Sequence, residues 1–329
     1  MSTGPPYLHR LITRREHLGW RWGRYLFSVK LVERSVQLEL KRQEDLEKLY
    51  HKKADFLYEE YDVSERQQEF EKLDWSLFRR SKLPERIATE VEKFPMMKDR
   101  VGNIVVSAVD LKSEESADLL VKDDGREILI SIHPETLVNW NSGRTTVLHE
   151  LMHVADMLDP SFLYEKRKLG ASPAEEEIVR QRFSLLWRIS IDGRLERKGE
   201  APSRNFRAYE PEFNRLFRRI PIGQHERILE KLWSGNSLTY RDLIGFAFDL
   251  SKLMEWAGIP VELIRDEGAG LVMASCCPLC RCRMYQAVRL DEQSDRARVD
   301  RIRKEFPEWS PDQGICQRCL EYCELSMIA

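Results

Sequence analysis

The feature that most constrains the fold of this chain is the confinement of its cysteines to one end. All seven lie between Cys276 and Cys323, and the first 275 residues contain none. A secreted disulfide scaffold usually spreads an even number of cysteines through the chain, whereas an odd cluster in one tail favours metal-binding thiols. The sequence therefore predicts a cytoplasmic protein with a separate metal-binding module at residues 274–329.

Two Cys-x-x-Cys pairs within this tail have the spacing of a zinc site. They are Cys277 with Cys280 and Cys316 with Cys319. Each pair is a tight turn that directs two thiolates at one ion, and two such turns complete a tetrahedral site. Four thiolates leave no open position, so we expect this Zn²⁺ to be structural. The tail resembles a zinc ribbon, with Cys276, Cys282 and Cys323 left over as alternative ligands.

Composition limits the remaining classes of protein. The 329 residues are 42% apolar and 33% charged, with a net charge of −2, which predicts two or three globular units rather than disorder. No apolar run reaches the ~18 residues of a membrane span, and charges near the N-terminus argue against a secretion signal. Residues 274–329 contain nine basic and nine acidic residues. That balance argues against nucleic acid as a partner and favours contacts with protein.

The pattern before residue 98 predicts helices. Residues 25–61 lack Gly and Pro and carry apolar residues every three or four positions, which is typical of a long amphipathic helix. Further helices are expected over residues 65–78 and 83–94, the latter between Pro84 and Pro95. We expect an N-terminal helical region at residues 1–98. Its amphipathic face is either packing surface or a site of self-association.

Residues 99–273 predict a mixed domain. NIVVSAVDL (residues 103–111) reads as a strand, and residues 118–132 read as a hairpin around Asp124-Gly125. A helix is expected from about Thr145, another over residues 173–197, and shorter ones up to Gly258, with breaks at Pro221 and Gly235-Asn236. The predicted class is α+β and mostly helical, with a small antiparallel sheet.

The most informative chemistry lies in the first of these helices. The sequence His149-Glu150-Leu151-Met152-His153 places two imidazoles four residues apart, on one face of a helix, where both reach one metal ion. Glu150 projects beside that ion and is suited to take a proton from water and deliver it to a leaving amine. The neighbouring residues are apolar, which predicts a buried helix. Two imidazoles and a carboxylate favour zinc.

This His-Glu-x-x-His segment resembles the zincin metallopeptidases. The order of hairpin, active-site helix and later acid-bearing helix is most similar to small gluzincin domains, over roughly residues 100 to 200. The resemblance implies a zincin-like catalytic domain that hydrolyses peptide bonds of a peptide or protein substrate. It also implies His149 and His153 as ligands of a catalytic Zn²⁺, with Glu150 as general base for a zinc-activated water.

The third ligand of that zinc has several candidates. Asp192 is preferred because it shares a helical face with the apolar residues Leu185 and Ile189, and an inward carboxylate needs a partner. Glu196, one turn later, and Asp159, at the spacing of the metzincins, remain open. Asp156 lies on the face of both histidines and is a candidate hydrogen-bond partner for one of them.

Two further expectations complete the sequence-based picture. Arg194 either stabilises an oxyanion or is a surface arginine near a helix end. The competing function is a non-enzymatic zinc-binding scaffold or regulator that uses the helical region and the ribbon for protein contacts. The intact glutamate of the motif favours the enzyme, because a scaffold has no need of Glu150.

Overall fold

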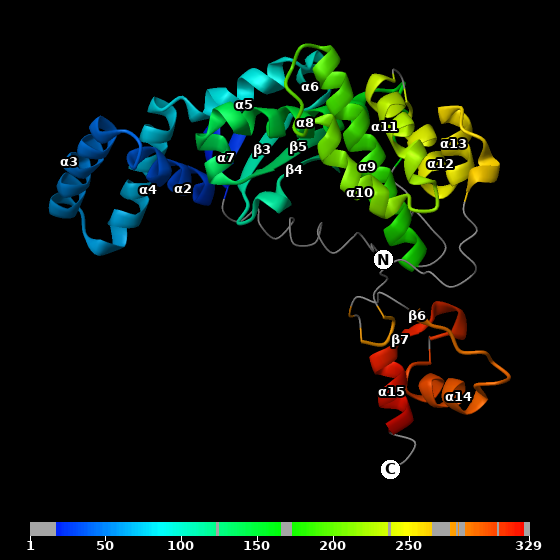
Figure 1. Cartoon of the computed structure of the whole chain (residues 1–329). Coiled ribbons are helices and arrows are strands. Elements are labelled where there is room, and N and C mark those ends of the chain that lie inside the picture. The colour runs from blue at the N-terminus through cyan, green and yellow to red at the C-terminus, as the bar shows by residue number, and fades with distance from the viewer. Residues whose placement is uncertain are drawn as a thin grey trace. The chain divides into compact units, whose positions relative to one another are not determined.

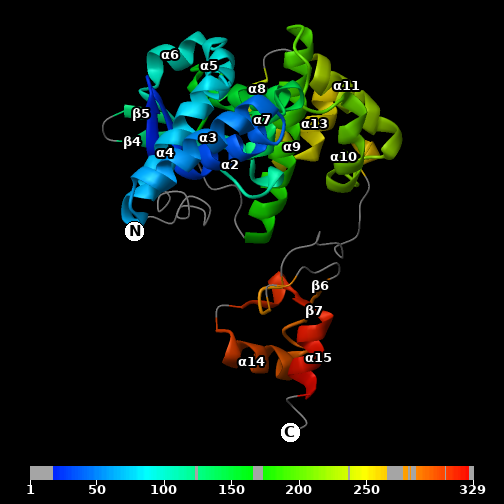
Figure 2. The ribbon, with the colours of Figure 1, turned by 90° about the vertical axis from the view of Figure 1, so that its left-hand side faces the viewer.

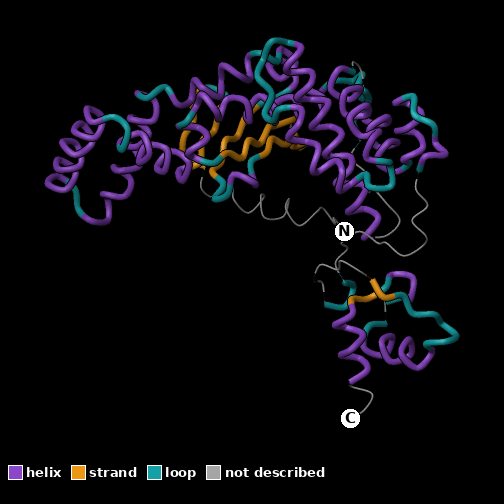
Figure 3. Tube along the Cα trace, in the orientation of Figure 1, coloured by secondary structure: helices purple, strands orange, loops and turns teal. Residues whose placement is uncertain are grey.

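The computed structural model describes residues 18–122, 125–165, 173–235, 238–264, 277–280, 282, 287–307 and 309–325. These residues form two compact units. The first contains the described residues of Met1–Tyr164, Ser190–Asn205 and Asn236–Tyr240, and the second those of Glu165–Ile189, Phe206–Gly235 and Arg241–Ala329. The described residues are mostly helical, with one small sheet and a separate two-stranded pair (Figure 3). None of the described helices is long and apolar enough to cross a membrane.

The first unit contains a five-stranded sheet in the order β1-β2-β3-β5-β4, of which Figure 1 labels β3, β4 and β5. Its strands are β1 (Leu18–Trp22), β2 (Tyr25–Ser28), β3 (Asn103–Ala108), β4 (Ser116–Lys122) and β5 (Gly125–Ile132). The β1–β2 and β4–β5 pairs are antiparallel, and the β2–β3 and β3–β5 pairs are parallel. The predicted strand and hairpin are therefore confirmed, but the prediction of an antiparallel sheet is wrong because the sheet is mixed.

The parallel pairing of β2 with β3 depends on a long helical crossover. Parallel neighbours need a connection of a dozen or more residues, and five helices fill it here. They are α2 (Val29–Leu40), α3 (Glu44–Glu60), α4 (Val63–Arg80), α5 (Leu83–Glu92) and α6 (Pro95–Arg100). Helices α3 and α4 extend beyond the sheet to the left in Figure 1 and therefore face the viewer in Figure 2. Helices α4 and α5 confirm the two helices predicted over residues 65–78 and 83–94.

The predicted continuous helix over residues 25–61 is wrong in two places. Residues Tyr25–Ser28 form β2, and Ser28 then starts α2 by accepting a hydrogen bond from the main chain of Leu31 at 3.3 Å. A serine at this position is a strong helix-start signal. The second break separates α2 from α3, where Arg42 donates to Val138 O and to Asn139 Oδ1, both at 2.9 Å. Both interruptions depend on hydrogen bonds that cannot be read from the spacing of the apolar residues.

The sheet and the crossover helices share one core. Its buried side chains run from Tyr25 on β2 to Leu158, and they include the fully buried Phe27, Phe78 and Ile104. The N-terminal helices therefore pack with the sheet instead of forming a core of their own. Burial on this scale stabilises by roughly 25 cal/mol for each Å² of apolar surface removed from water.

Two helices follow β5 and enter this core. They are α7 (Pro134–Val138) and α8 (Trp140–Leu158). Gly143 lets their backbones approach closely, because a Cβ atom at this position would lie 1.9 Å from the carbonyl oxygen of Thr136. At the other end, Arg100 donates to the carbonyl oxygen of Leu158 at 2.7 Å, which caps the last turn of α8. Both ends of α8 are thus fixed by neighbouring elements.

Helices dominate the second unit. Helix α9 (Pro173–Arg197) has the bounds expected from the sequence, and its last residues, from Ser190, belong to the first unit. The others are α10 (Glu210–Leu216), α11 (His225–Ser234), α12 (Tyr240–Phe248) and α13 (Leu250–Ala257), with short 3-10 turns at Phe206–Tyr209, Ile222–Gln224 and Val261–Leu263. The predicted breaks at Pro221, Gly235 and Gly258 are confirmed.

The cysteine-rich tail has a small core of its own. Strands β6 (Ala287–Val288) and β7 (Ile315–Cys316) pair antiparallel, and helices α14 (Arg296–Glu305) and α15 (Gln317–Leu325) accompany them. Helix α14 lies between the two cysteine pairs in the sequence. The core consists of Cys277, Leu290, Val299, Ile302, Trp309, Ile315, Leu320 and Cys323. Two thiols are thus part of the hydrophobic packing.

Candidate metal centres

Helix α8 brings His149, Glu150 and His153 together, as the spacing predicts. Their candidate ligand atoms all lie within 4.8 Å of one another. The two imidazole rings have centroids 5.1 Å apart and planes inclined by 73°. His149 is buried, whereas Glu150 and His153 are half-buried. The arrangement offers two imidazole nitrogens and a carboxylate, which is a donor set that fits a divalent transition metal such as zinc.

Asp192 on α9 lies against the first of these histidines. Its Oδ1 is 2.6 Å from Nδ1 of His149, and the side chain is fully buried. Oδ1 also accepts from the main-chain N–H of Ser203 at 3.0 Å, and Oδ2 accepts from Ser203 Oγ and from the N–H of Arg204, both at 2.9 Å. Each carboxylate oxygen therefore has two donors. The inward direction predicted for Asp192 is confirmed, and its partner is the ring of His149.

This contact determines which nitrogen of His149 is left for a metal. An ionised carboxylate only accepts hydrogen bonds, so Nδ1 of His149 is the donor, and in a neutral imidazole Nε2 is then the nitrogen without a proton. The unprotonated Nε2 is then the atom able to bind a metal ion. Ser203 Oγ lies 3.1 Å from the same Nδ1 and closes a compact group of three side chains. Ser203 was not expected from the sequence, because it belongs to a turn outside any regular pattern.

Asp156 and Arg194 form a second pair between α8 and α9. Arg194 donates from Nη1 and Nη2 to the two carboxylate oxygens of Asp156, at 2.7 and 2.5 Å. Asp156 is buried and Arg194 is partly exposed. A two-point contact of this kind fixes the orientation of the guanidinium group relative to the carboxylate. Asp156, expected as a hydrogen-bond partner for a histidine, thus has the guanidinium of Arg194 as a partner, and the candidate catalytic group Arg194 is engaged with a carboxylate.

The other two candidates for the third ligand lie outside the His-Glu-His group that the described residues form. Asp159 follows the last residue of α8, and its Oδ1 accepts from the N–H and from the hydroxyl of Ser161, both at 2.8 Å. Glu196 is exposed near the end of α9. Their place at helix ends, rather than on the inward faces of α8 and α9, keeps both carboxylates from that group.

Glu150 has a main-chain partner that the sequence did not indicate. Its Oε2 accepts from the N–H of Ala117 at 3.2 Å. Ala117 belongs to β4, which is an edge strand of the sheet and packs against α8. The carboxylate that the resemblance assigns as general base is therefore tied to the backbone of a neighbouring strand.

An ion-pair network fixes the first turns of α8. Arg144 donates to Glu90 Oε1 at 2.8 Å and to Glu200 Oε2 at 2.5 Å, and Lys93 contacts the same two glutamates at 2.9 and 2.7 Å. The network links α5, α8 and the segment after α9 that carries Ser203. It therefore fixes the start of α8 relative to the segment after α9, and both lie near His149.

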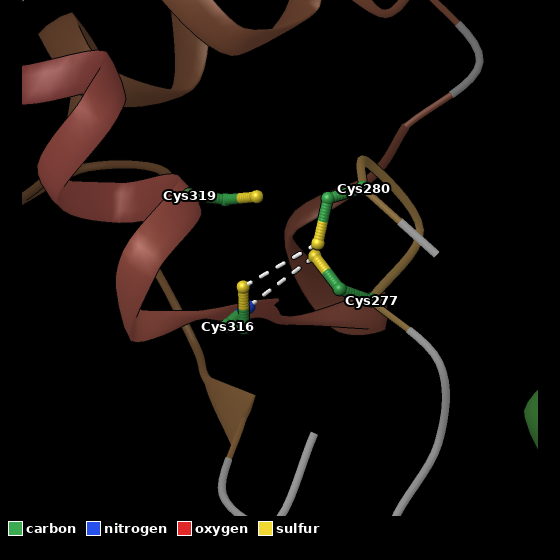
Figure 4. Close-up of side chains that lie close together, drawn as sticks. All are labelled: Cys277, Cys280, Cys316 and Cys319. Atoms are coloured by element: carbon green, nitrogen blue, oxygen red, sulfur yellow. Dashed lines mark hydrogen bonds between the residues drawn. The ribbon is translucent and has the colours of Figure 1, made fainter. Parts of the chain in front are cut away.

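The four predicted cysteine ligands also come together. The sulfur atoms of Cys277, Cys280, Cys316 and Cys319 lie within 4.8 Å of one another and point toward a common centre (Figure 4). Cys280 Sγ is 3.7 Å from Cys316 Sγ, and the N–H of Cys316 donates to Cys277 Sγ at 3.4 Å. All four are free thiols. Four soft sulfur donors fit a zinc ion in a closed structural site.

Neighbouring groups change the acidity of these thiols. A hydrogen bond from the main chain of Cys282, with the adjoining thiols, lowers the pKa of Cys280 to about 6. Burial raises the pKa of Cys316 and of Cys319. Of the three left-over cysteines, Cys282 is exposed, Cys323 is buried in the small core, and Cys276 lies outside the described residues.

Comparison with known proteins adds no relative. No family model, curated protein or solved structure matches the chain. The assignment of function therefore depends on the geometry of the two centres and on the motif itself.

Proposed function

We propose that the chain is a zinc-dependent peptidase whose reaction takes place at His149, Glu150 and His153. The observation that carries the proposal is the buried contact between Asp192 and His149 Nδ1. It directs the unprotonated Nε2 of His149 to the metal, and such outer partners orient metal-binding histidines in many proteins. A histidine that served packing alone would not need a fully buried carboxylate with four donors.

In this proposal the side chains have distinct roles. His149 and His153 hold the metal, and Asp192 orients His149 instead of binding the metal itself. Zinc in this position supplies Lewis-acid activation of water and of the substrate carbonyl. Glu150 takes the proton of the attacking water on its carboxylate and passes it to the leaving amine. Peptide as the substrate class follows from the resemblance to zincins, because residue chemistry alone also permits other hydrolyses.

The cysteine centre is proposed as a structural Zn²⁺ site. Its four thiols leave no open position for a substrate. The arginines of α14 pair with acidic side chains of the module itself. This pairing argues against a role in binding nucleic-acid phosphates. The ion pairs are Arg296–Asp300, Arg298–Asp295, Arg301–Glu305 and Arg303–Glu292. We therefore propose that the module contributes to folding or to contact with another protein.

The second candidate function is a zinc-binding scaffold or regulator without catalysis. It is favoured by exposed apolar side chains on the helical hairpin of α3 and α4. Phe56, Tyr58 and Val63 are 55%, 56% and 80% exposed. Such residues suit contact with a protein partner or with a second copy of the chain. In this reading Glu150 does not act as a base.

One substitution separates the two functions. Glu150→Gln is assayed for zinc content and for cleavage of an unstructured protein such as casein. The peptidase predicts zinc content equal to that of the unchanged chain and activity lower by about 10²- to 10⁴-fold. The scaffold predicts no activity in either protein. Full activity in Glu150→Gln would contradict the peptidase.

A further inference from the structure

The hydrogen bond between Ala117 and Glu150 uses a main-chain group that the sheet leaves open. Val109 N donates to Ile132 O, so Ile132 presents its main-chain groups to the β3 side of the sheet. Alternate residues of a strand face the same way, and Ile130 therefore also faces β3. Ala117 is opposite Ile130 in the β4–β5 register. Its N–H consequently makes no ladder bond and points from the open edge toward Glu150.

We propose that the main-chain N–H of Ala117 is a positioning group for Glu150. The inference rests on the proposed peptidase function, in which this carboxylate moves the proton. A glutamate side chain has three rotatable bonds, and holding one oxygen to a rigid strand limits the orientations of the carboxylate. A hydrogen bond to an ionised acceptor is also among the stronger ones in proteins. The edge strand thus keeps the base beside both histidines.

The register of β4 provides a variant that removes only this donor. Ala117→Pro deletes the N–H, and proline is tolerated on an edge strand where the N–H faces away from the sheet. Val121 is the matched control, because it lies opposite Arg126, faces the same open edge and is 75% exposed. Val121→Pro makes the same backbone change two alternations further along β4.

The first measurement is steady-state hydrolysis by the full-length zinc-loaded chain, with zinc content determined alongside. Loss of one charge-assisted hydrogen bond predicts a kcat about 10- to 100-fold lower in Ala117→Pro. KM and zinc content stay as in the unchanged chain, because neither substrate nor metal loses a contact. Val121→Pro keeps the kcat of the unchanged chain. Equal kcat values in Ala117→Pro and the unchanged chain would overturn the inference and leave the peptidase proposal standing.

The second measurement does not depend on activity. Amide hydrogen exchange is followed at Ala117 and Val121 in the unchanged chain and in Glu150→Ala. We expect the amide of Ala117 to exchange at least about tenfold faster in the variant, because its acceptor is gone. The amide of Val121 exchanges equally in both proteins. An unchanged exchange rate at Ala117 would overturn the inference. This result does not depend on whether Ala117→Pro folds, because the measurement does not use that variant. An unchanged chain without peptidase activity would overturn both proposals.

Discussion

The two candidate metal centres differ in how their ligands are supported. His149 and His153 project from a helix whose neighbours, from Tyr25 to Leu158, form a large core, and a buried carboxylate fixes one ring. The cysteine centre has only a small core, and Cys277 and Cys323 are members of it. The first centre is supported by the fold, whereas in the second the ligands supply part of the fold. The two should therefore respond differently to the loss of metal.

The largest expected effect is on the cysteine module. Cys277→Ser or treatment with a chelator removes its metal, and structural zinc contributes about 10–16 kcal/mol to the folding of comparable small modules. We expect residues 277–325 to lose protection against amide exchange while the sheet of the first unit keeps its protection. Exchange mass spectrometry measures both regions in one experiment.

Cys282→Ser is the control for that experiment. Cys282 is exposed and lies outside the four-sulfur group of the described residues. Its replacement should leave the module folded and its zinc bound. Equal protection of the module with and without metal would remove the distinction between the two centres.

The next largest effect concerns catalysis. Glu150→Gln lowers hydrolysis by about 10²- to 10⁴-fold while both zinc ions stay bound, because the amide cannot accept the proton. Glu196→Gln changes an exposed glutamate of the same unit and should hydrolyse like the unchanged chain. A similar loss in both variants would show that the effect is not specific to the motif.

Local spacing made both centres predictable. Residues four apart on a helix, or three apart in a tight turn, face one another without help from the rest of the chain. The surroundings of Asp192 were harder to predict. Its carboxylate accepts from the N–H groups of Ser203 and Arg204, which lie in a turn after α9. The inward face of α9 is encoded by its period. Which atom of His149 that face meets is determined by tertiary packing.

The errors in the predicted fold also arise where tertiary contacts, and not the local pattern, determine the structure. The segment over residues 25–61 has an apolar period typical of one helix, and the structure interrupts it at Ser28 and Arg42. Ser28 was a readable signal, since it is a favoured helix-start residue. The interruption at Arg42 depends on carbonyl groups about 96 residues away in the chain. The sequence does not predict the parallel centre of the sheet, because the apolar period of residues 25–61 indicates a helix where the structure has β2.

A smaller effect tests the role assigned to Asp192. Asp192→Ala removes the acceptor of His149 Nδ1, and loss of such a partner lowers metal affinity by about 10- to 100-fold. Competition with a zinc chelator measures the affinity of this centre in the Cys277→Ser background. Asp159→Asn, at the alternative third ligand, should leave the affinity unchanged. An unaltered affinity in Asp192→Ala would contradict the orienting role.

A separate effect, on stability, lies in the core that supports the histidine centre. Asp74 on α4 is buried, and its Oδ1 has no hydrogen-bond partner within the described residues. Burial, with the nearby Glu33 and Glu71, raises the pKa of Asp74 to about 7. The folded chain therefore binds this proton more tightly than the unfolded chain, and stability falls as pH rises from about 4 to 7.

Asp74→Asn should remove that dependence. We expect the variant to be more stable than the unchanged chain at pH 8, by up to about 4 kcal/mol, and similar to it below pH 4. Urea unfolding of the first unit across this pH range measures the difference. A parallel pH dependence in the two proteins would show that Asp74 does not titrate as the structure indicates.

The most direct test of two independent centres is zinc stoichiometry by elemental analysis. The unchanged chain, His149→Ala and Cys277→Ser are purified under identical conditions and measured per chain. We expect about two zinc ions for the unchanged chain and about one for each variant. Zinc content in His149→Ala equal to that of the unchanged chain would contradict a metal centre on α8, and with it the proposed peptidase.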